Sequence, residues 1–342
     1  MVKKLLGSQQ AGLVLIIVAL GAALTFFAGT HDDRTSGASV NNFLNSNTLI
    51  QTATDASFFA IMAVGATIVI ISGGIDLSVG SIYALAGVTM AMVLRSTGAT
   101  GGSSVLLGFV VCVGVGLLCG LLNGILVVVL RVHPFIITLG TMWILRGIAF
   151  VTSKAESILI PNSLTAVAKS SLGLRDSLYP VPMLVMLTVA IIGSIYLTRT
   201  VMGRHVFAFG GNPEASRFSG LRLDRIQTSV YLISGVCAGL AAFMGASFYG
   251  SASCGDATGY ELYVIASAVV GGASLSGGKG SAISAMLGAL LIVLIRQSIR
   301  TLRFDQNYEW IIVGVAIIIA VVLDQASARM NAQRLAKAAS GR

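Results

Sequence analysis

Long apolar runs alternate with short polar segments along most of the chain. A helix needs about 17–25 mostly apolar residues to cross a bilayer, so this pattern predicts an all-α polytopic membrane protein with about ten transmembrane helices. The predicted spans are residues 11–29, 53–72, 79–94, 103–130, 134–152, 180–197, 227–249, 260–270, 282–295 and 309–323. The runs at 260–270 and 282–295 are short, so the segment between them is a candidate for a turn that enters the membrane without crossing it.

A glycine-rich break occurs twice, each time between two apolar runs. It reads GGIDLSVGS at 73–81 and GGASLSGGKGS at 271–281. The positions of interest in the two copies are Gly73, Gly74, Asp76, Leu77, Ser78, Gly80, Gly271, Gly272, Leu275, Ser276 and Gly278. The duplication predicts two related halves, at about 52–152 and 227–324. Six predicted spans separate the breaks, which places both on the cytoplasmic side as a direct repeat. The glycines are interpreted either as hinges or as sites of close packing.

Composition agrees with a single transmembrane domain over residues 1–342. The chain is 55% hydrophobic and 10% charged, whereas soluble domains carry about 25% charged residues. Its net charge of +9 comes from basic residues scattered over short loops, which argues against a nucleic-acid-binding domain. Lys and Arg are more numerous in the loops predicted to lie inside than in those outside, so we expect both termini in the cytoplasm.

Several short motifs bear on helix packing, ligand binding or catalysis. Gly116, Gly120 and Gly124 recur every fourth residue, which is typical of a helix-packing face in membranes. Asp76 is interpreted as a cap of the helix that follows it, or alternatively as a contact for a substrate or gate.

The GGKGS segment fails as a phosphate-binding loop because Ala273 occupies the first required glycine position. The histidines and cysteines show no catalytic or metal-binding spacing, so no catalytic, cofactor or metal site is predicted.

A short helix is predicted within the basic loop 198–226. Asn212 suits an N-cap, Pro213 the first helical position and Gly220 a left-handed C-terminal residue. The predicted element comprises Asn212, Pro213, Glu214, Ala215, Ser216, Arg217, Phe218, Ser219 and Gly220. We interpret it as a docking element for a partner, with a helix lying on lipid headgroups as the alternative.

Residues 71–86 (ISGGIDLSVGSIYALA), 123–130, 134–147 (PFIITLGTMWILRG), 212–220 and 259–281 together identify a resemblance. The chain resembles the permease subunits of bacterial ABC importers for simple sugars of the ribose, xylose, arabinose and galactose type. The resemblance implies the ten-helix fold of vitamin B12 importers and a location in the inner membrane. It also implies a permease dimer, formed with itself or a paralogue, and cytoplasmic ATP-binding subunits that carry ATP and Mg²⁺. A periplasmic sugar-binding protein and a coupling helix at 212–220 complete the implied assembly.

Polar residues within the predicted spans are candidates for the translocation path, namely Asn123, Thr141, Arg146 and Glu261. Arg146 is also interpreted as a structural partner of a helix terminus. Three alternatives to the sugar importer remain: an ion-coupled secondary sugar transporter, a membrane scaffold without transport activity, and an ABC permease for a related polar compound such as a sugar-like signalling molecule.

Overall fold

The computed structural model describes residues 9–32, 39–173, 178–315, 318–319 and 322. Its helices are α2 (Gln9–Phe27), α3 (Ser46–Ile71), α4 (Val79–Thr97), α5 (Gly101–Leu130), α6 (Pro134–Ser153), α7 (Asn162–Ala168), α8 (Val181–Arg199), α9 (Val201–Gly211), α10 (Pro213–Phe218), α11 (Leu223–Tyr249), α12 (Tyr260–Val270) and α13 (Ala282–Thr301). Residues 308–315 are also helical. Two small antiparallel pairs join β1 (Thr30–Asp32) to β2 (Ser39–Asn41) and β3 (Ile158–Leu159) to β4 (Ser251–Ala252).

The prediction of an all-α polytopic membrane protein is confirmed. Eight helices in the described residues are long and apolar enough to cross a membrane. The predicted span 260–270 is different, because α12 has 11 residues and a helix of that length extends only about 16 Å. The predicted span 309–323 lies partly outside the described residues. The vitamin B12 importer fold stays a prediction.

Helix boundaries differ from the expected ones where polar side chains find partners. Helix α3 begins at Ser46, seven residues earlier than expected, because the Asn45 side chain accepts a hydrogen bond from the Thr48 amide at 2.8 Å and caps the first turn. The basic segment 198–226 contains α9, α10 and the start of α11 in place of an extended loop. Helix α9 starts after Thr200, whose hydroxyl accepts from the Gly203 amide at 3.0 Å.

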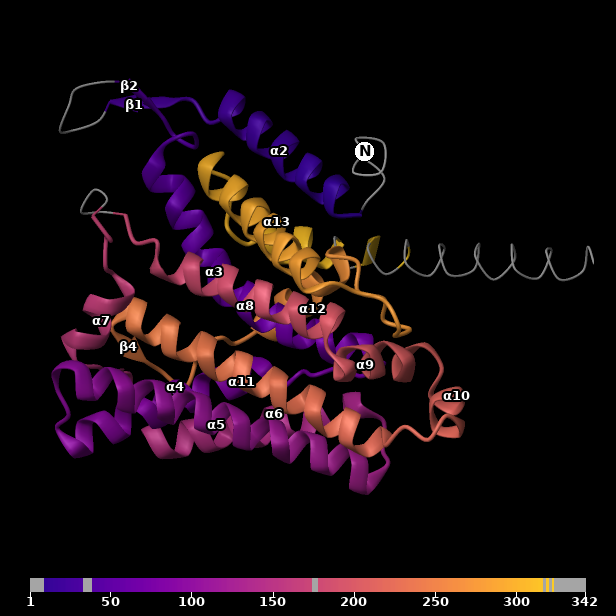
Figure 1. Cartoon of the computed structure of the whole chain (residues 1–342). Helices are drawn as coiled ribbons and strands as arrows, with labels where there is room; N and C mark the ends of the chain where they lie inside the picture. The colour runs from indigo at the N-terminus through magenta and orange to yellow at the C-terminus, as the bar shows by residue number, and fades with distance from the viewer. Residues whose placement is uncertain (1–8, 33–38, 174–177, 316–317, 320–321, 323–342) are drawn as a thin grey trace, which may run out of the picture.

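Helix α3 lies at the centre of the molecule and packs against α8, α11, α12 and α13. Its side chains are buried continuously from Ala56 to Ile71. Helices α5, α6 and α8 instead present large apolar side chains outward, such as Leu118, Trp143 and Ile192. This distribution fits a lipid-solvated protein, in which the outer surface is as apolar as the core. Figure 1 shows α9 and α10 at one end of the helices and α7 with β1 and β2 at the other.

The glycine face of α5 packs directly on α11. A Cβ added at Gly116 would overlap the carbonyl oxygen of Gly235, and one added at Gly120 would overlap that of Tyr231. At Gly124 the added Cβ would lie 2.8 Å from the Thr228 Cα. Backbone therefore meets backbone along this interface, as expected where small residues let membrane helices approach closely.

This interface predicts opposite outcomes for two glycines of the same helix. Gly120→Ala forces α5 away from α11 and should destabilise the protein by about 1–3 kcal/mol. Gly114→Ala is the matched control, because a Cβ there meets nothing within 4 Å and alanine is favoured over glycine in a helix by about 0.5–1 kcal/mol. Thermal unfolding in detergent measures both. Equal midpoints for the two variants would contradict the close packing.

Candidate coupling and translocation elements

The two glycine breaks end their preceding helices in the same way. After α3, Gly73 has φ +83°, its amide donates to the Ile70 carbonyl, and the Gly74 amide donates to the Val69 carbonyl. This pair of hydrogen bonds around a left-handed glycine is a Schellman motif.

After α12, Gly272 has φ +90° and its amide donates to the Val269 carbonyl, while the Ala273 amide donates to the Ala268 carbonyl. The second break therefore repeats the Schellman motif. The left-handed residue is the first glycine of the pair in one copy and the second glycine in the other, so the two motifs are offset by one residue from the sequence alignment.

The second break contacts the end of α3, just before the first break. The Gly278 amide donates a hydrogen bond of 2.8 Å to the Ile71 carbonyl, which belongs to the last residue of α3. A Cβ added at Gly280 would lie 2.8 Å from the Ile71 side chain. The end of α3 and the second break, separated by about 200 residues in the sequence, thus form one junction.

Helix α9 ends at this junction. A Cβ added at Gly210 would overlap the Ile71 carbonyl oxygen and lie 2.8 Å from the Gly278 amide nitrogen. A Cβ added at Gly277 would lie 2.6 Å from the Gly210 carbonyl oxygen. The last turn of α9 therefore touches the end of α3 and the second break through backbone atoms, with no side chain between them.

Helix α10 follows α9 after the single residue Asn212. The Asn212 side chain accepts from the Ala215 amide at 2.9 Å, so it caps α10 as the sequence indicated. Gly220 has φ +79° and its amide donates to the Arg217 carbonyl. The Phe218 side chain is 90% exposed. Helix α10 is thus a short, capped helix with an exposed apolar side chain. One residue joins it to the end of α9, which lies at the junction.

Asp76 is buried in the first break and connects three helices. Its Oδ1 accepts from the Ser78 amide at 3.0 Å and from the Ser78 hydroxyl at 2.6 Å, just before α4. Its Oδ2 accepts from the Ser234 hydroxyl of α11 at 2.8 Å, and the Asn123 amide of α5 donates to Ser78 Oγ at 2.7 Å. Both carboxylate oxygens therefore bind protein hydroxyls within the fold.

Asp76→Ala should destabilise the protein by about 2–3 kcal/mol, because it leaves the buried Ser78 and Ser234 hydroxyls without their charged acceptor. Glu156→Ala is the control, since Glu156 is exposed. Thermal unfolding midpoints measure the difference. If Asp76→Ala unfolds at the same temperature as the parent, the carboxylate has no structural role, and its interpretation as a substrate or gate contact gains support.

The four predicted path residues do not meet in one place. Asn123 joins the Asp76 network, and Thr141 donates to the Thr138 carbonyl of its own helix. Arg146 and Glu261 both approach Gly80, at 3.6 Å and 2.5 Å from the position of an added Cβ. Asn123 therefore belongs to one polar group at the start of α4, and Arg146 and Glu261 belong to another.

Arg146 also stabilises irregular backbone. Its Nη1 donates to the carbonyls of Cys254 and Asp256, at 2.8 and 2.6 Å, in the segment before α12. Non-helical backbone within a membrane protein requires such internal partners. Arg146 therefore contacts loop carbonyls, where the sequence interpretation placed a helix terminus.

The sequence matches a known protein family over most of its length. Residues 48–321 match the family described as branched-chain amino acid transport system / permease component. The D-allose transport system permease protein AlsC of Escherichia coli (strain K12) is 37% identical over 285 residues, which cover 83% of this chain and 85% of that protein. The chain belongs to this permease family. Two further relatives are the ribose import permease RbsC of Escherichia coli (strain K12), 34% identical over 83% of this chain and 87% of its own length, and the fructose import permease FrcC of Rhizobium meliloti, 31% identical over 83% and 79%.

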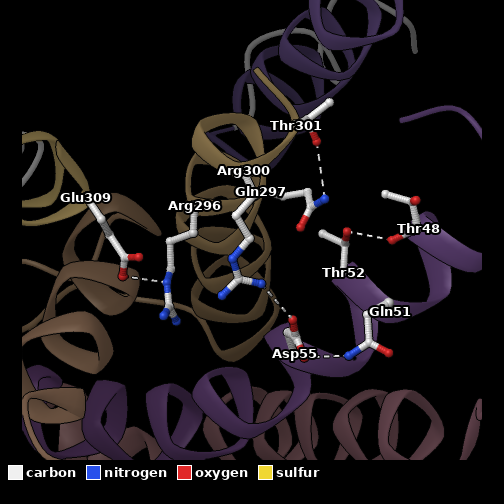
Figure 2. A network of polar contacts seen from close by, with 9 residues as sticks. All are labelled: Thr48, Gln51, Thr52, Asp55, Arg296, Gln297, Arg300, Thr301 and Glu309. Carbon is white, nitrogen blue, oxygen red and sulfur yellow. Dashed lines mark hydrogen bonds and ion pairs between the residues drawn. The ribbon is translucent and has the colours of Figure 1, made fainter. Parts of the chain in front are cut away.

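The permease also contains a charged network that the sequence interpretation missed (Figure 2). Arg296 Nε of α13 lies 2.6 Å from Glu309 Oε1, as an ion pair without hydrogen-bond alignment, and the Tyr263 hydroxyl donates to the same oxygen at 2.6 Å. Arg300 Nη1 lies 3.6 Å from Asp55 Oδ2 of α3. A signal existed in the sequence, because Asp55 and Arg296 both fall within apolar runs, where ionisable residues are rare and often functional.

Proposed function

We propose that this permease is the membrane-spanning subunit of an ATP-driven importer that moves a monosaccharide into the cytoplasm. The observation that carries the proposal is the structure of α10, a capped and exposed helix. One residue joins it to α9, whose backbone contacts the end of α3 and the second break. A force applied to α10 by a partner would reach α3, α12 and α13 through atoms already in contact.

The class of substrate is supported by the relatives, whose printed names specify D-allose, ribose and fructose. A phosphate-binding loop is missing from the sequence, so ATP and Mg²⁺ are assigned to a separate cytoplasmic subunit that docks on α10. A second permease chain and a periplasmic sugar-binding protein complete the proposed assembly. The permease itself is then a translocation subunit without a bound cofactor.

The proposed orientation places α9, α10 and the start of α2 in or near the cytoplasm. Both regions lie at one end of the molecule, opposite β1, β2 and α7 (Figure 1). A cytoplasmic N-terminus agrees with the basic bias of the predicted inner loops. The C-terminal residues, which lie outside the described structure, are assigned to the same side by that charge bias.

The proposal is tested by purifying the chain from its native membrane and identifying copurified subunits by mass spectrometry. The complex is then reconstituted in vesicles with ATP, the periplasmic fraction is added outside, and uptake of labelled D-ribose, D-allose and D-fructose is measured. We expect copurification of an ATP-hydrolysing subunit and uptake that requires ATP. Uptake driven by a proton or sodium gradient with the chain alone would overturn the proposal in favour of a secondary transporter. ATP-dependent uptake of a different polar compound would overturn the substrate class.

A further inference from the structure

A polar and aromatic cavity opens between α3, α11, α12 and α13, beside the charged network of Figure 2. About 430 Å³ of empty space, part of it open to solvent, lies between the lining side chains. Its residues come from the first half of α3, the last turn of α11, the first turn of α12 and the last turns of α13. In the proposed orientation, these positions face the outside, at the end of the molecule opposite α10.

The walls of this cavity, which we name the mouth pocket, carry both donors and acceptors. Asp55 provides a carboxylate on α3, while Arg296, Gln297 and Arg300 provide two guanidinium groups and an amide on α13. The Arg300–Asp55 distance of 3.6 Å is longer than the roughly 2.7–2.9 Å of a charge-assisted hydrogen bond. A hydroxyl group beside this loose pair can accept from the guanidinium and donate to the carboxylate.

Charge balance narrows the class of ligand. Arg300 faces Asp55, and Arg296 faces Glu309, so each cation of the mouth pocket has a carboxylate partner. An anionic ligand would have to displace a carboxylate, whereas a neutral ligand with many hydroxyl groups can bind both signs at once. The balanced charges therefore favour a neutral polyhydroxyl compound over a phosphate or a carboxylic acid.

Aromatic rings complete the lining. Phe59, Tyr249 and Tyr260 lie in the walls, and Phe59 and Tyr260 are themselves in contact, with ring centroids 4.4 Å apart. The Arg296 guanidinium sits over the Phe59 ring at 5.3 Å, which holds it in place. Apolar and aromatic walls with a few placed polar groups are typical of small-molecule sites, and the C–H faces of a sugar ring can pack on such rings while its hydroxyls bind the polar side.

We propose that the mouth pocket binds a neutral monosaccharide on its way into the permease. This inference rests on the proposed function, because that function supplies the sugar and the direction of entry. It assigns Asp55 and Arg300 to hydroxyl recognition and Tyr260 to ring packing, while Gln297 and Tyr249 line the pocket without an assigned contact.

Cysteine protection tests the mouth pocket directly. The native cysteines are all buried, so Gln297→Cys in the complete complex provides a single accessible thiol in the pocket for a membrane-impermeant maleimide. D-Ribose, D-allose or D-fructose at about ten times its Kd should slow the labelling about tenfold. Phe304→Cys is the control, because Phe304 is exposed just beyond α13 and outside the pocket, and its labelling should not respond. Tyr249→Cys probes the opposite wall and carries the test if Gln297→Cys fails to assemble.

The outcomes separate this inference from the proposed function. A complex that imports sugar without protection at either pocket cysteine overturns the mouth pocket and leaves the proposed function standing. Protection without import supports sugar binding while overturning the proposed function. A complex that shows neither protection nor import overturns both. Ribose 5-phosphate is the last probe, since protection by it alone would overturn the assignment to a neutral ligand.

Discussion

Gly210→Ala is expected to abolish ATP-dependent uptake. The added methyl group would overlap the Ile71 carbonyl oxygen and lie 2.8 Å from the Gly278 amide nitrogen. These are backbone atoms of the end of α3 and of the second break, which cannot move aside as a flexible side chain can. Separating α9 from Ile71 should strain the 2.8 Å Gly278–Ile71 hydrogen bond and cost about 3 kcal/mol, the upper end of the usual range for overpacking.

The neighbouring residue provides a matched control. Gly211→Ala adds the same methyl group one position later in α9, where it would meet nothing within 4 Å. Uptake and the thermal unfolding midpoint are measured for both variants in the reconstituted complex. We expect normal uptake for Gly211→Ala, and a lowered midpoint with lost uptake for Gly210→Ala. Indistinguishable variants would show that the contact of α9 with the end of α3 and the second break is not required.

Phe218→Ala is expected to uncouple the permease from its ATP-hydrolysing subunit without unfolding it. The side chain is 90% exposed, so its removal takes little packing from the folded chain. If Phe218 fills a pocket on the partner, truncation should cost about 2 kcal/mol or more of binding free energy, which corresponds to roughly 30-fold weaker docking. The affinity for the copurified ATPase subunit and ATP-dependent uptake measure this effect.

Leu159→Ala is the control for Phe218. Leu159 is 80% exposed in β3. This strand pairs with β4, which lies at the end of the molecule opposite α10 (Figure 1), so truncation of Leu159 should leave docking unchanged. The alternative, in which α10 lies on lipid headgroups, predicts that Phe218→Ala also leaves ATPase affinity unchanged. That result would contradict the docking role and favour a membrane-surface role.

Local signals were sufficient for α10. An N-cap, a proline at the first helical position and a left-handed glycine act within a few residues of one another, and the structure contains all three at the expected positions. The presence of α9 was harder to predict, because Val201–Gly211 is basic and only weakly apolar. Its stability comes from contact with residues distant in the sequence, such as Ile71 and Gly278.

The sequence by itself determined the all-α membrane architecture, the approximate course of the long helices and the positions of the two glycine-rich breaks, because hydrophobic length and glycine placement act locally. Only the tertiary structure decided that the end of α3 meets the second break at Ile71 and Gly278, and that Asp55 and Arg300 share a cavity. The physical reason is that these contacts join residues about 200 or more positions apart, and helix packing, which periodicity does not encode, brings them together.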